Sequence, residues 1–414
     1  MNWDRLPIAL RLVLGGLALI PVRCTPISLK TNQQSAVRAS GRAVDTEHEL
    51  MIRHLTVVDD PARTIEPCDP LGSGNLPPWS FGALISQVAE QVGASDPSEF
   101  VLRWLELWDQ EQSVNGYPVP GRERMRPIIT DPWLQASGGS TLDLRKAPFR
   151  LAAIVNRMDL RRSDGNQPLD AGEARFVFNA VDDTCRRIEF TVILEFKLRA
   201  SDPGAVVDWA NRWHALGDLE FGANYNQALQ SITDDFTQDF AQLRTNDLAI
   251  SFVEWEQRTF INASGALTLS PLPNTPDGSF NQTTPLASYV NEHAEEILTE
   301  THEVPAWMLG GYVQASFFWD SLEIKDRLKV RHHFGMQTCN GCHSSETGTR
   351  FVHVFPRRDH EVAELSDFLT GENMPTFDPF DQPRTFNELQ RRADLLQQLL
   401  GNGYFPVART NRVH

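Results

Sequence analysis

The chain has 414 residues, a formal net charge of -16, and 41% hydrophobic and 22% charged residues. The charge disfavours binding to phosphate backbones and anionic lipid surfaces, so nucleic acid is not an expected partner. The composition is that of a globular protein rather than a disordered or fibrous one. A chain of this length has room for about two or three domains.

Residues 1–24 have the pattern of an export signal, because a basic start precedes the apolar stretch 12–22. This stretch is shorter than the roughly 20 residues that span a bilayer, so we expect no transmembrane span. Cys24 follows where a bacterial lipoprotein signal places its lipidated cysteine, although Arg23 replaces the usual small residue. We therefore expect an exported protein, either periplasmic or attached at the outer membrane or cell surface through Cys24.

The stretch 25–75 is polar and rich in turn residues, which predicts a linker or tether. The first strong helix signal follows, with Asp96 as the expected N-cap and Pro97 as the first helical residue. Apolar residues then recur at helical spacing, a pattern typical of core packing, at Phe100, Val101, Trp104, Leu105 and Trp108.

The middle of the chain alternates between two kinds of pattern. Runs rich in β-branched and aromatic residues predict strands at 149–158, 174–181, 188–198, 248–261 and 266–272. Helical spacing predicts helices at 203–216, 224–240 and 286–300. A short turn that contains Cys185 separates the second and third strands, so we expect them to form an antiparallel pair.

These elements predict an α+β fold. A large mixed body with an antiparallel sheet and helices is expected over 76–318, and a small, mainly helical unit is expected over 319–414. The last helix of that unit should begin with a capping box formed by Thr385 and Glu388, and it should stop at Gly401.

The stretch Cys-Asn-Gly-Cys-His at 339–343 carries the strongest chemical signal, because chance is a poor explanation for it. Two cysteines at this spacing lie on one side of a helical turn, where their sulfurs can form thioethers with both vinyl groups of one haem. His343 is then directed at the iron from the same side. A disulfide or a redox dithiol would also use two cysteines at this spacing, and a zinc site would need two further ligands.

The chain has five cysteines. If Cys339 and Cys342 act together and Cys24 belongs to the export signal, Cys68 and Cys185 are left as a pair. In an oxidising compartment this predicts a disulfide between them.

The motif resembles that of the c-type cytochromes, and the resemblance covers the chain from about Trp319 onward. Class I members have a helix before the motif, then a proline, a Met-Pro segment and a closing helix. Pro356 and Met374-Pro375 match this order, although Met374 lies closer to His343 than is usual. The preceding body resembles uncharacterised secreted bacterial proteins with one haem motif near the C-terminus, which implies no known activity.

The resemblance implies one haem c with His343 as the proximal iron ligand. Two residues are candidates for the distal position. His353 lies between two phenylalanines in a stretch that would place all three on one face if extended, and Met374 is the second candidate. The distal position could also be taken by His360 or by a residue of the body, or it could be empty.

The stretch 156–165 mixes an asparagine, arginines and aspartates at the expected end of a strand. Solvated ion pairs are the favoured interpretation of this cluster, and a polar pocket is the second interpretation.

We expect an extracytoplasmic monohaem cytochrome that transfers single electrons to or from a redox partner protein. The acidic composition is typical of a solvated secreted protein and would also suit a basic partner. A second hypothesis is a haem enzyme of the peroxidase type with an open sixth position. A third is a binding protein with an appended haem module. An electron carrier is favoured over a catalyst.

Overall fold

The computed structural model describes residues 41–69, 74–248, 255–314 and 317–407. All of them belong to one compact unit that begins at Gly41. The predicted export signal and its Cys24 lie outside the described residues. Within the described ranges, no helix combines the length and the apolar character needed to cross a membrane.

The fold is mixed α+β and is built on a large antiparallel sheet. The order of neighbouring strands is β1-β4-β7-β8-β9-β10-β11, and β12 also pairs with β10. The strands of this sheet are β1 (Met51–Ile52), β4 (Phe149–Arg157), β7 (Glu173–Val181), β8 (Arg187–Lys197), β9 (Phe240–Asp247), β10 (Glu256–Ala263), β11 (Ala266–Ser270) and β12 (Tyr312–Gln314).

Short hairpins and helices surround the sheet. The hairpins pair β2 (Gln112–Val114) with β3 (Tyr117–Val119), β5 (Ser163–Asp164) with β6 (Gln167–Pro168), and β13 (Thr376–Phe377) with β14 (Pro383–Arg384). The α-helices are α1 (Thr46–Glu49), α2 (Leu55–Val58), α3 (Phe81–Gln91), α4 (Pro97–Glu106), α5 (Asp131–Ser137), α6 (Pro203–Ala215), α7 (Ala223–Phe236), α8 (Thr284–Glu292), α9 (Ala294–Leu298), α10 (Val330–Met336), α11 (Asp367–Thr370) and α12 (Glu388–Asn402).

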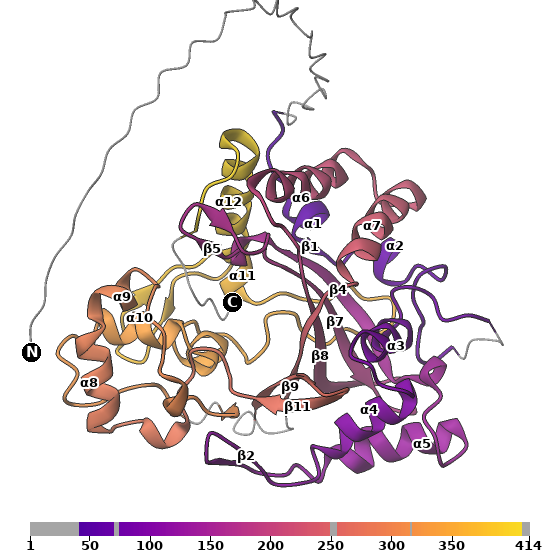
Figure 1. The fold of residues 1–414 in the computed structure, drawn as a ribbon, viewed down its shortest axis with the longest axis horizontal. Helices are drawn as coiled ribbons and strands as arrows, with labels where there is room; N and C mark the ends of the chain where they lie inside the picture. Colours follow the sequence, from indigo (N-terminus) through magenta and orange to yellow (C-terminus); the bar gives the residue numbers. More distant parts are fainter. Residues whose placement is uncertain (1–40, 70–73, 249–254, 315–316, 408–414) are drawn as a thin grey trace, which may run out of the picture. The chain divides into compact units, whose positions relative to one another are not determined.

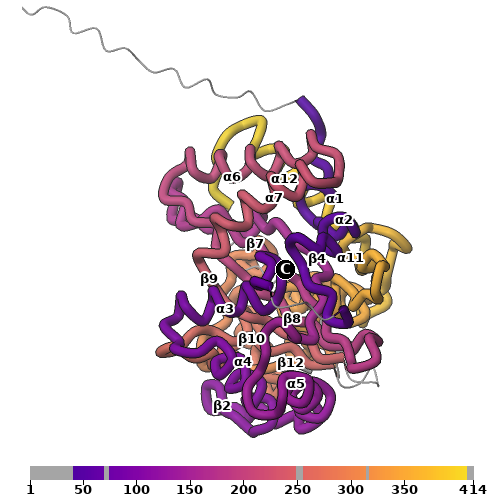
Figure 2. Tube along the Cα trace, turned by 90° about the vertical axis from the view of Figure 1, so that its right-hand side faces the viewer, coloured from indigo at the N-terminus to yellow at the C-terminus, as the bar shows by residue number. Residues whose placement is uncertain are grey.

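The sheet separates two groups of helices. In Figure 1 it lies between α3, α4 and α5 on one side and α8, α9 and α10 on the other. Figure 2 looks from the side of α3, α4 and α5 and shows the same order of layers. The segment that carries the motif is therefore on the opposite side of the sheet from the first long helices.

The two faces of the sheet bury different kinds of side chain, because successive residues of a strand point to opposite faces. In β7, Phe176 packs against the ring of Phe236 from α7, with ring centroids 5.7 Å apart. Its neighbour Val177 belongs instead to an apolar cluster with Cys342 of the motif. Arg175, two residues before Val177, shares the face that points toward the motif. This second face is where apolar and charged side chains meet.

Several predicted elements are confirmed. The predicted strands 174–181 and 188–198 correspond to β7 and β8, an antiparallel pair with Cys185 in the connection. Asp96 caps α4 by accepting a hydrogen bond from the backbone N–H of Ser98. The predicted helix at 286–300 is divided into α8 and α9.

The capping of the last helix differs from the prediction. The N-cap of α12 is Asn387, whose Oδ1 accepts from the backbone N–H of Gln390 at 3.0 Å, rather than Thr385. The helix also continues through Gly401 and ends at Asn402. Asparagine is as good an N-cap as threonine, so the choice between two nearby candidates depends on the path of the chain before the helix.

The stretch 41–69 is folded, which corrects the prediction of a linker over 25–75. It contributes α1, α2 and β1, and β1 pairs with β4 at the edge of the sheet. Ile52 and Val57 are fully buried. These few apolar residues are outweighed in the composition by their polar neighbours, but they bury enough surface to hold the segment on the sheet.

The C-terminal region shares its core with the sheet. Cys342, Phe368 and Leu389 lie in one apolar cluster with Ala152 of β4 and Val177 of β7. The expected boundary between 318 and 319 is therefore crossed by a common core in the described residues. Apolar residues that pack between two units have the same pattern as those that pack within one, so the sequence does not reveal such a contact.

Cys68 and Cys185 form a disulfide that links residues 117 positions apart. We expect the double variant Cys68→Ser/Cys185→Ser to lose about 2–5 kcal/mol of unfolding free energy, because an open chain has more freedom when unfolded. Urea unfolding of the oxidised protein measures this difference. Equal stability of the variant and the wild type, or free thiols at both positions in periplasmic material, would contradict the pairing.

His302 is buried among the helices that cover the motif side of the sheet. Its ring contacts those of Tyr289 and Phe334, with centroid distances of 6.1 and 5.9 Å. Neither ring nitrogen has a hydrogen-bond partner among the described residues. Burial lowers the pKa of His302 from 6.5 to about 4.

The low pKa of His302 predicts a loss of stability in mild acid. Between pH 6.5 and about 4 the unfolded chain binds a proton at this position that the folded chain does not bind. Stability therefore falls as the pH decreases through this window. We expect His302→Phe to reduce the difference in unfolding free energy between pH 7 and pH 4.5. An equal difference in this variant and in the wild type would contradict this expectation.

Candidate functional site

The motif 339–343 follows α10 directly and continues into a π-helical turn over Gly341–Ser345. Thr338 closes the turn, because its Oγ1 donates to the carbonyl of Gly335 at 2.7 Å and accepts from the N–H of Gly341 at 3.3 Å. A side chain at Gly341 would collide with the carbonyl of Gly335. The small residues of this stretch therefore allow the tight turn that holds both cysteines.

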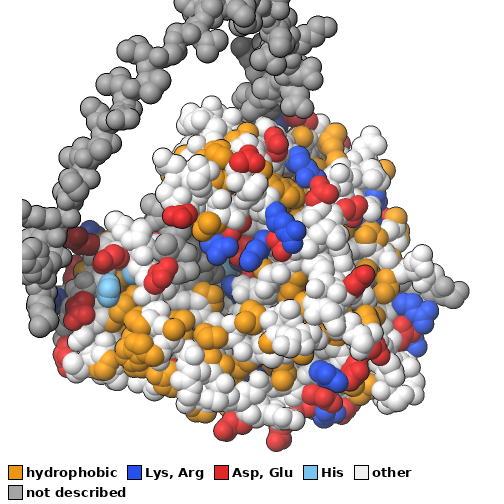
Figure 3. Space-filling model, in the orientation of Figure 1, with side chains coloured by type: hydrophobic (Ala, Val, Ile, Leu, Met, Phe, Trp, Pro, Cys, Tyr) orange, Lys and Arg blue, Asp and Glu red, His pale blue; other side chains and the backbone are white. Residues whose placement is uncertain are grey.

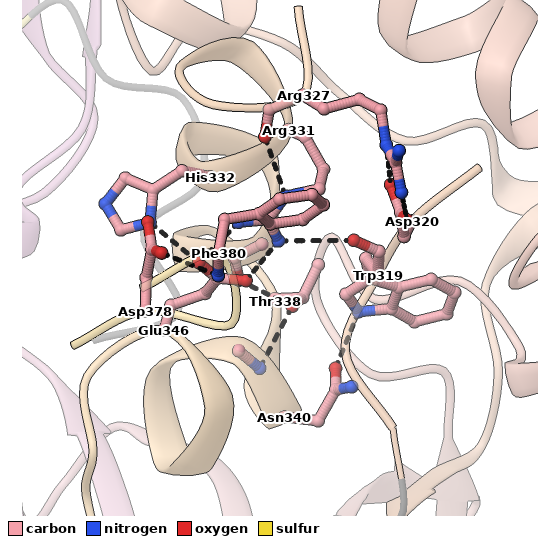
Figure 4. Close-up of polar contacts among 12 residues, drawn as sticks. Trp319, Asp320, Arg327, Arg331, His332, Thr338, Asn340, Glu346, Asp378 and Phe380 are labelled. Atoms are coloured by element: carbon pink, nitrogen blue, oxygen red, sulfur yellow. Dashed lines mark hydrogen bonds and ion pairs between the residues drawn. The ribbon is translucent and has the colours of Figure 1, made fainter. Parts of the chain in front are cut away.

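A buried polar network contacts residues before and after the second cysteine (Figure 4). The indole Nε1 of Trp319 donates to Oδ1 of Asn340, inside the motif, at 2.6 Å. Arg331 donates to both carboxylate oxygens of Glu346, at 2.5 and 3.1 Å, and both side chains are 0% exposed. Nδ1 of His332 lies 2.7 Å from the same carboxylate. These contacts tie α10 to Glu346, after the second cysteine, and tie Trp319 to Asn340, before it.

The same network contains three potential metal ligands, His332, Glu346 and Asp378, whose ligand atoms lie within 4.8 Å of one another. Arg331 already pairs with Glu346, and Arg384 pairs with Asp378 at 2.6 Å. Because these guanidinium groups neutralise the carboxylates, we interpret the cluster as structural. The motif cysteines are not part of this cluster, so it gives no support to a zinc site at the motif.

Both motif cysteines are buried thiols at 0% exposure, and they are not joined by a disulfide. Cys342 packs with Val177 and Val354, and Cys339 packs with Trp255. Burial raises the pKa of Cys339 and raises that of Cys342 well above its usual range. A thiol that stays protonated is a poor nucleophile, which disfavours a redox dithiol at this position.

The ring of His343 lies between those of Trp255 and His353, with centroid distances of 5.4 and 4.4 Å. Its Nδ1 lies 2.8 Å from the carbonyl oxygen of Phe351. A carbonyl only accepts, so Nδ1 carries the proton and the lone pair is on Nε2, the tautomer of a metal-ligating histidine. Burial lowers the pKa of His343 to about 4, which keeps the imidazole neutral.

Phe351 has a left-handed backbone conformation, with φ of 68°, which is rare for a bulky residue. This conformation lets one residue bond to His343 twice. The N–H of Phe351 donates to the carbonyl of His343 at 2.9 Å, and its own carbonyl accepts from the ring. Backbone strain of this kind is typical of functional sites, where it fixes the orientation of a side chain.

A cavity of about 70 Å³ separates the motif from the second face of the sheet. His343 and His353 form part of its wall. Apolar side chains cover much of the remainder, namely Met51, Val155, Val177, Ile193, Val352, Val354 and Leu369. The polar part of the wall comes mainly from the strands and α12, with Arg157, Arg175, Thr191, Arg244, Asn246, Gln257 and Arg392.

Of the distal candidates, His353 is the one that the structure brings to the motif. Its Nε2 lies 3.4 Å from Sγ of Cys342, and its Nδ1 lies 3.0 Å from the hydroxyl of Ser366. Met374 is not among the described residues that line the cavity. The side chain of His360 is 80% exposed.

A second, larger pocket of about 510 Å³ also borders the motif region. Phe351 and Phe355 line this pocket, whereas Val352, His353 and Val354 line the smaller cavity. The segment 351–355 therefore forms the wall between the two.

The start of the stretch 156–165 is buried. The favoured interpretation, solvated ion pairs, is therefore wrong for these residues. Arg157 and Asp159 are 2% and 6% exposed, and Nε of Arg157 donates to Oδ1 of Asp159 at 2.9 Å. One signal for this burial is present in the sequence. The residues 151–155 before Arg157 are all apolar, on both faces of the strand, which indicates burial on both sides.

Comparison with known proteins gives no match, since no family model, no curated protein and no solved structure is similar to this chain at a significant level.

Proposed function

We propose that the protein is an exported monohaem c-type cytochrome that transfers single electrons. Cys339 and Cys342 would hold the haem c through thioethers, and His343 would be the proximal iron ligand. The observation that supports the proposal most strongly is the protonation state of the His343 imidazole, which follows directly after the two thiols in the motif. A Cys-x-x-Cys-His turn places a neutral imidazole, protonated on Nδ1 by its bond to Phe351, on the wall of a cavity.

The residues around the cavity suit a haem chemically. Valine, isoleucine and leucine side chains provide an apolar surface for the ring. A volume of about 70 Å³ holds only a few water molecules, since one water needs roughly 10–15 Å³. Haem attachment therefore requires this cavity to enlarge.

A haem attached here supplies an iron that exchanges one electron at a time. The chain contributes the orientation of His343 through Phe351, the burial that sets the potential, and the packing that keeps water away. His353, held by Ser366, is the candidate distal ligand that lies nearest to the motif. Met374 stays the second candidate.

A redox partner protein is part of the proposal. The chain carries a net charge of -16, which favours a partner with a basic docking surface. On the face shown in Figure 3, acidic and basic side chains lie among one another rather than in separate patches. Because the attraction comes from the net charge of the chain, complex formation should weaken as added salt screens the surface charges.

The test is expression in a periplasm that matures cytochromes c, followed by a pyridine haemochrome spectrum. We expect one covalent haem per chain and a low-spin ferric electron paramagnetic resonance signal. Chain without covalent haem under these conditions would refute the proposal. A high-spin haem that reacts promptly with peroxide would refute the carrier and support the haem enzyme instead.

A further inference from the structure

The cavity beside the motif has a cationic wall. Four arginines line it, from three strands of the sheet and from α12, and no aspartate or glutamate is among the described residues that line it. Their carboxylate partners are outside this wall. Arg175, for example, lies 2.8 Å from Glu173 and 3.4 Å from Glu195, neither of which lines the cavity.

One buried group of ion pairs beside the cavity contains more positive than negative side chains. Ion pairs connect three arginines to only two carboxylates, in the set Arg157, Arg391, Arg392, Asp159 and Glu388. Arg392 has the longest contacts of the set, 3.5 Å to Glu388 and 3.9 Å to Asp159. Burial lowers the pKa of Arg392 to about 9, and Arg157 nearby adds to this effect. A buried positive charge with distant partners is stabilised by an additional anion.

Gln257 provides an independent observation. It lies in β10, lines the same cavity and is 0% exposed. Neither its Oε1 nor its Nε2 has a hydrogen-bond partner among the described residues. Its strand neighbour Asn246, by contrast, is satisfied by Thr191 and Trp255. A buried amide without partners is costly, and a ligand with a polar head would satisfy it.

We propose that this cavity is a carboxylate-binding site, with Arg392 and Gln257 as ligand-contacting residues. A carboxylate accepts hydrogen bonds from guanidinium and amide groups, and its charge offsets the excess on the arginines. The apolar walls select a carboxylate on a hydrocarbon body. The evidence for this site comes from the residues that line the cavity, and it does not depend on the proposed haem.

Such a carboxylate has two sources. It is either a propionate group of a haem attached at the motif or a separate organic acid. Both share the same chemistry, and they differ in whether the site is still open once haem is present.

The test uses the full chain as the double variant Cys339→Ser/Cys342→Ser, in which no thioether can form. Binding of propionate is measured by saturation-transfer NMR and by thermal unfolding, with propionamide as the neutral control of the same shape. We expect propionate to bind and to raise the melting temperature, and propionamide to do neither. Arg392→Met in this background should weaken propionate binding at least 10-fold, because hydrogen bonds to charged groups are the stronger ones.

Gln257→Met provides the second variant. It removes an unpartnered buried amide, so we expect it to fold at least as stably as its parent and to weaken propionate binding. Arg103→Met, in an exposed ion pair far along the chain, is the matched control and should leave binding unchanged. Equal binding of propionate and propionamide, or propionate binding that neither variant weakens, would overturn the proposal.

The haem-loaded wild type then identifies the source. Loss of propionate binding on loading indicates that the haem propionates occupy the site, and retained binding indicates a separate acid. Both outcomes support a carboxylate site. Failure to incorporate haem would refute the proposed function only, since the binding experiment on the double variant decides the present inference independently.

Discussion

Replacement of both motif cysteines is expected to abolish the proposed covalent haem attachment completely. In Cys339→Ala/Cys342→Ala no thioether can form, so acidified acetone should extract all haem, and the intact mass should be that of the polypeptide alone. Both cysteines are buried, and the motif contains no other thiol that could replace them. Intact-mass spectrometry measures the effect directly.

The disulfide cysteines provide the matched control for this experiment. Cys68→Ser/Cys185→Ser also removes two cysteines, but from a pair bonded to each other outside the motif. It should retain covalent haem while losing stability. His343→Ala should retain at least one thioether and change the spin state of the iron, because the proposed proximal ligand is lost. Haem that stays covalently attached without the motif cysteines would exclude the assignment.

Replacement of Arg331 by methionine is expected to cost about 3–5 kcal/mol of unfolding free energy, the largest effect of a single substitution outside the cysteines. Its guanidinium and the carboxylate of Glu346 are both 0% exposed. Loss of the cation leaves a buried carboxylate with His332 as its remaining basic neighbour. Urea unfolding, and hydrogen exchange of the amides around 339–346, measure the global and the local effect.

Two further variants separate the ion pair from simple truncation. Arg331→Met/Glu346→Gln removes both charges, so it should be less destabilised than the sum of its single variants. Arg103→Met breaks an exposed pair with Glu99, whose side chains are 64% and 51% exposed, and should cost at most about 1 kcal/mol. Equal losses in Arg331→Met and Arg103→Met would show that the buried pair does not hold the motif.

The local elements could be predicted because short-range patterns control them. The stripe of α4 and its cap at Asp96 follow from residues within one helix. The pairing of β7 with β8 follows from two β-rich runs joined by a short turn. The identity of the motif is also local, because its chemistry needs only Cys339, Cys342 and His343 at a fixed spacing.

The neighbours of the motif could not be predicted in the same way. Gln257 and Arg392 are far apart in the chain, and they line one cavity because α12 packs over one face of the sheet. Arg157 is an ordinary charged residue by composition, and its burial depends on what packs over β4. No local pattern distinguishes an arginine that faces water from one that faces a cavity.

The sequence by itself determined the motif, several helices and strands of the middle of the chain, and the cysteines left over for a disulfide. These depend on residue type and spacing, which a linear chain displays. Only the tertiary structure decided that the segment after α10 packs on the sheet, that Phe351 bonds to the ring of His343, and that a cationic cavity lies beside them. The physical reason is that burial, hydrogen-bond partners and the balance of charge are properties of contacts between distant residues.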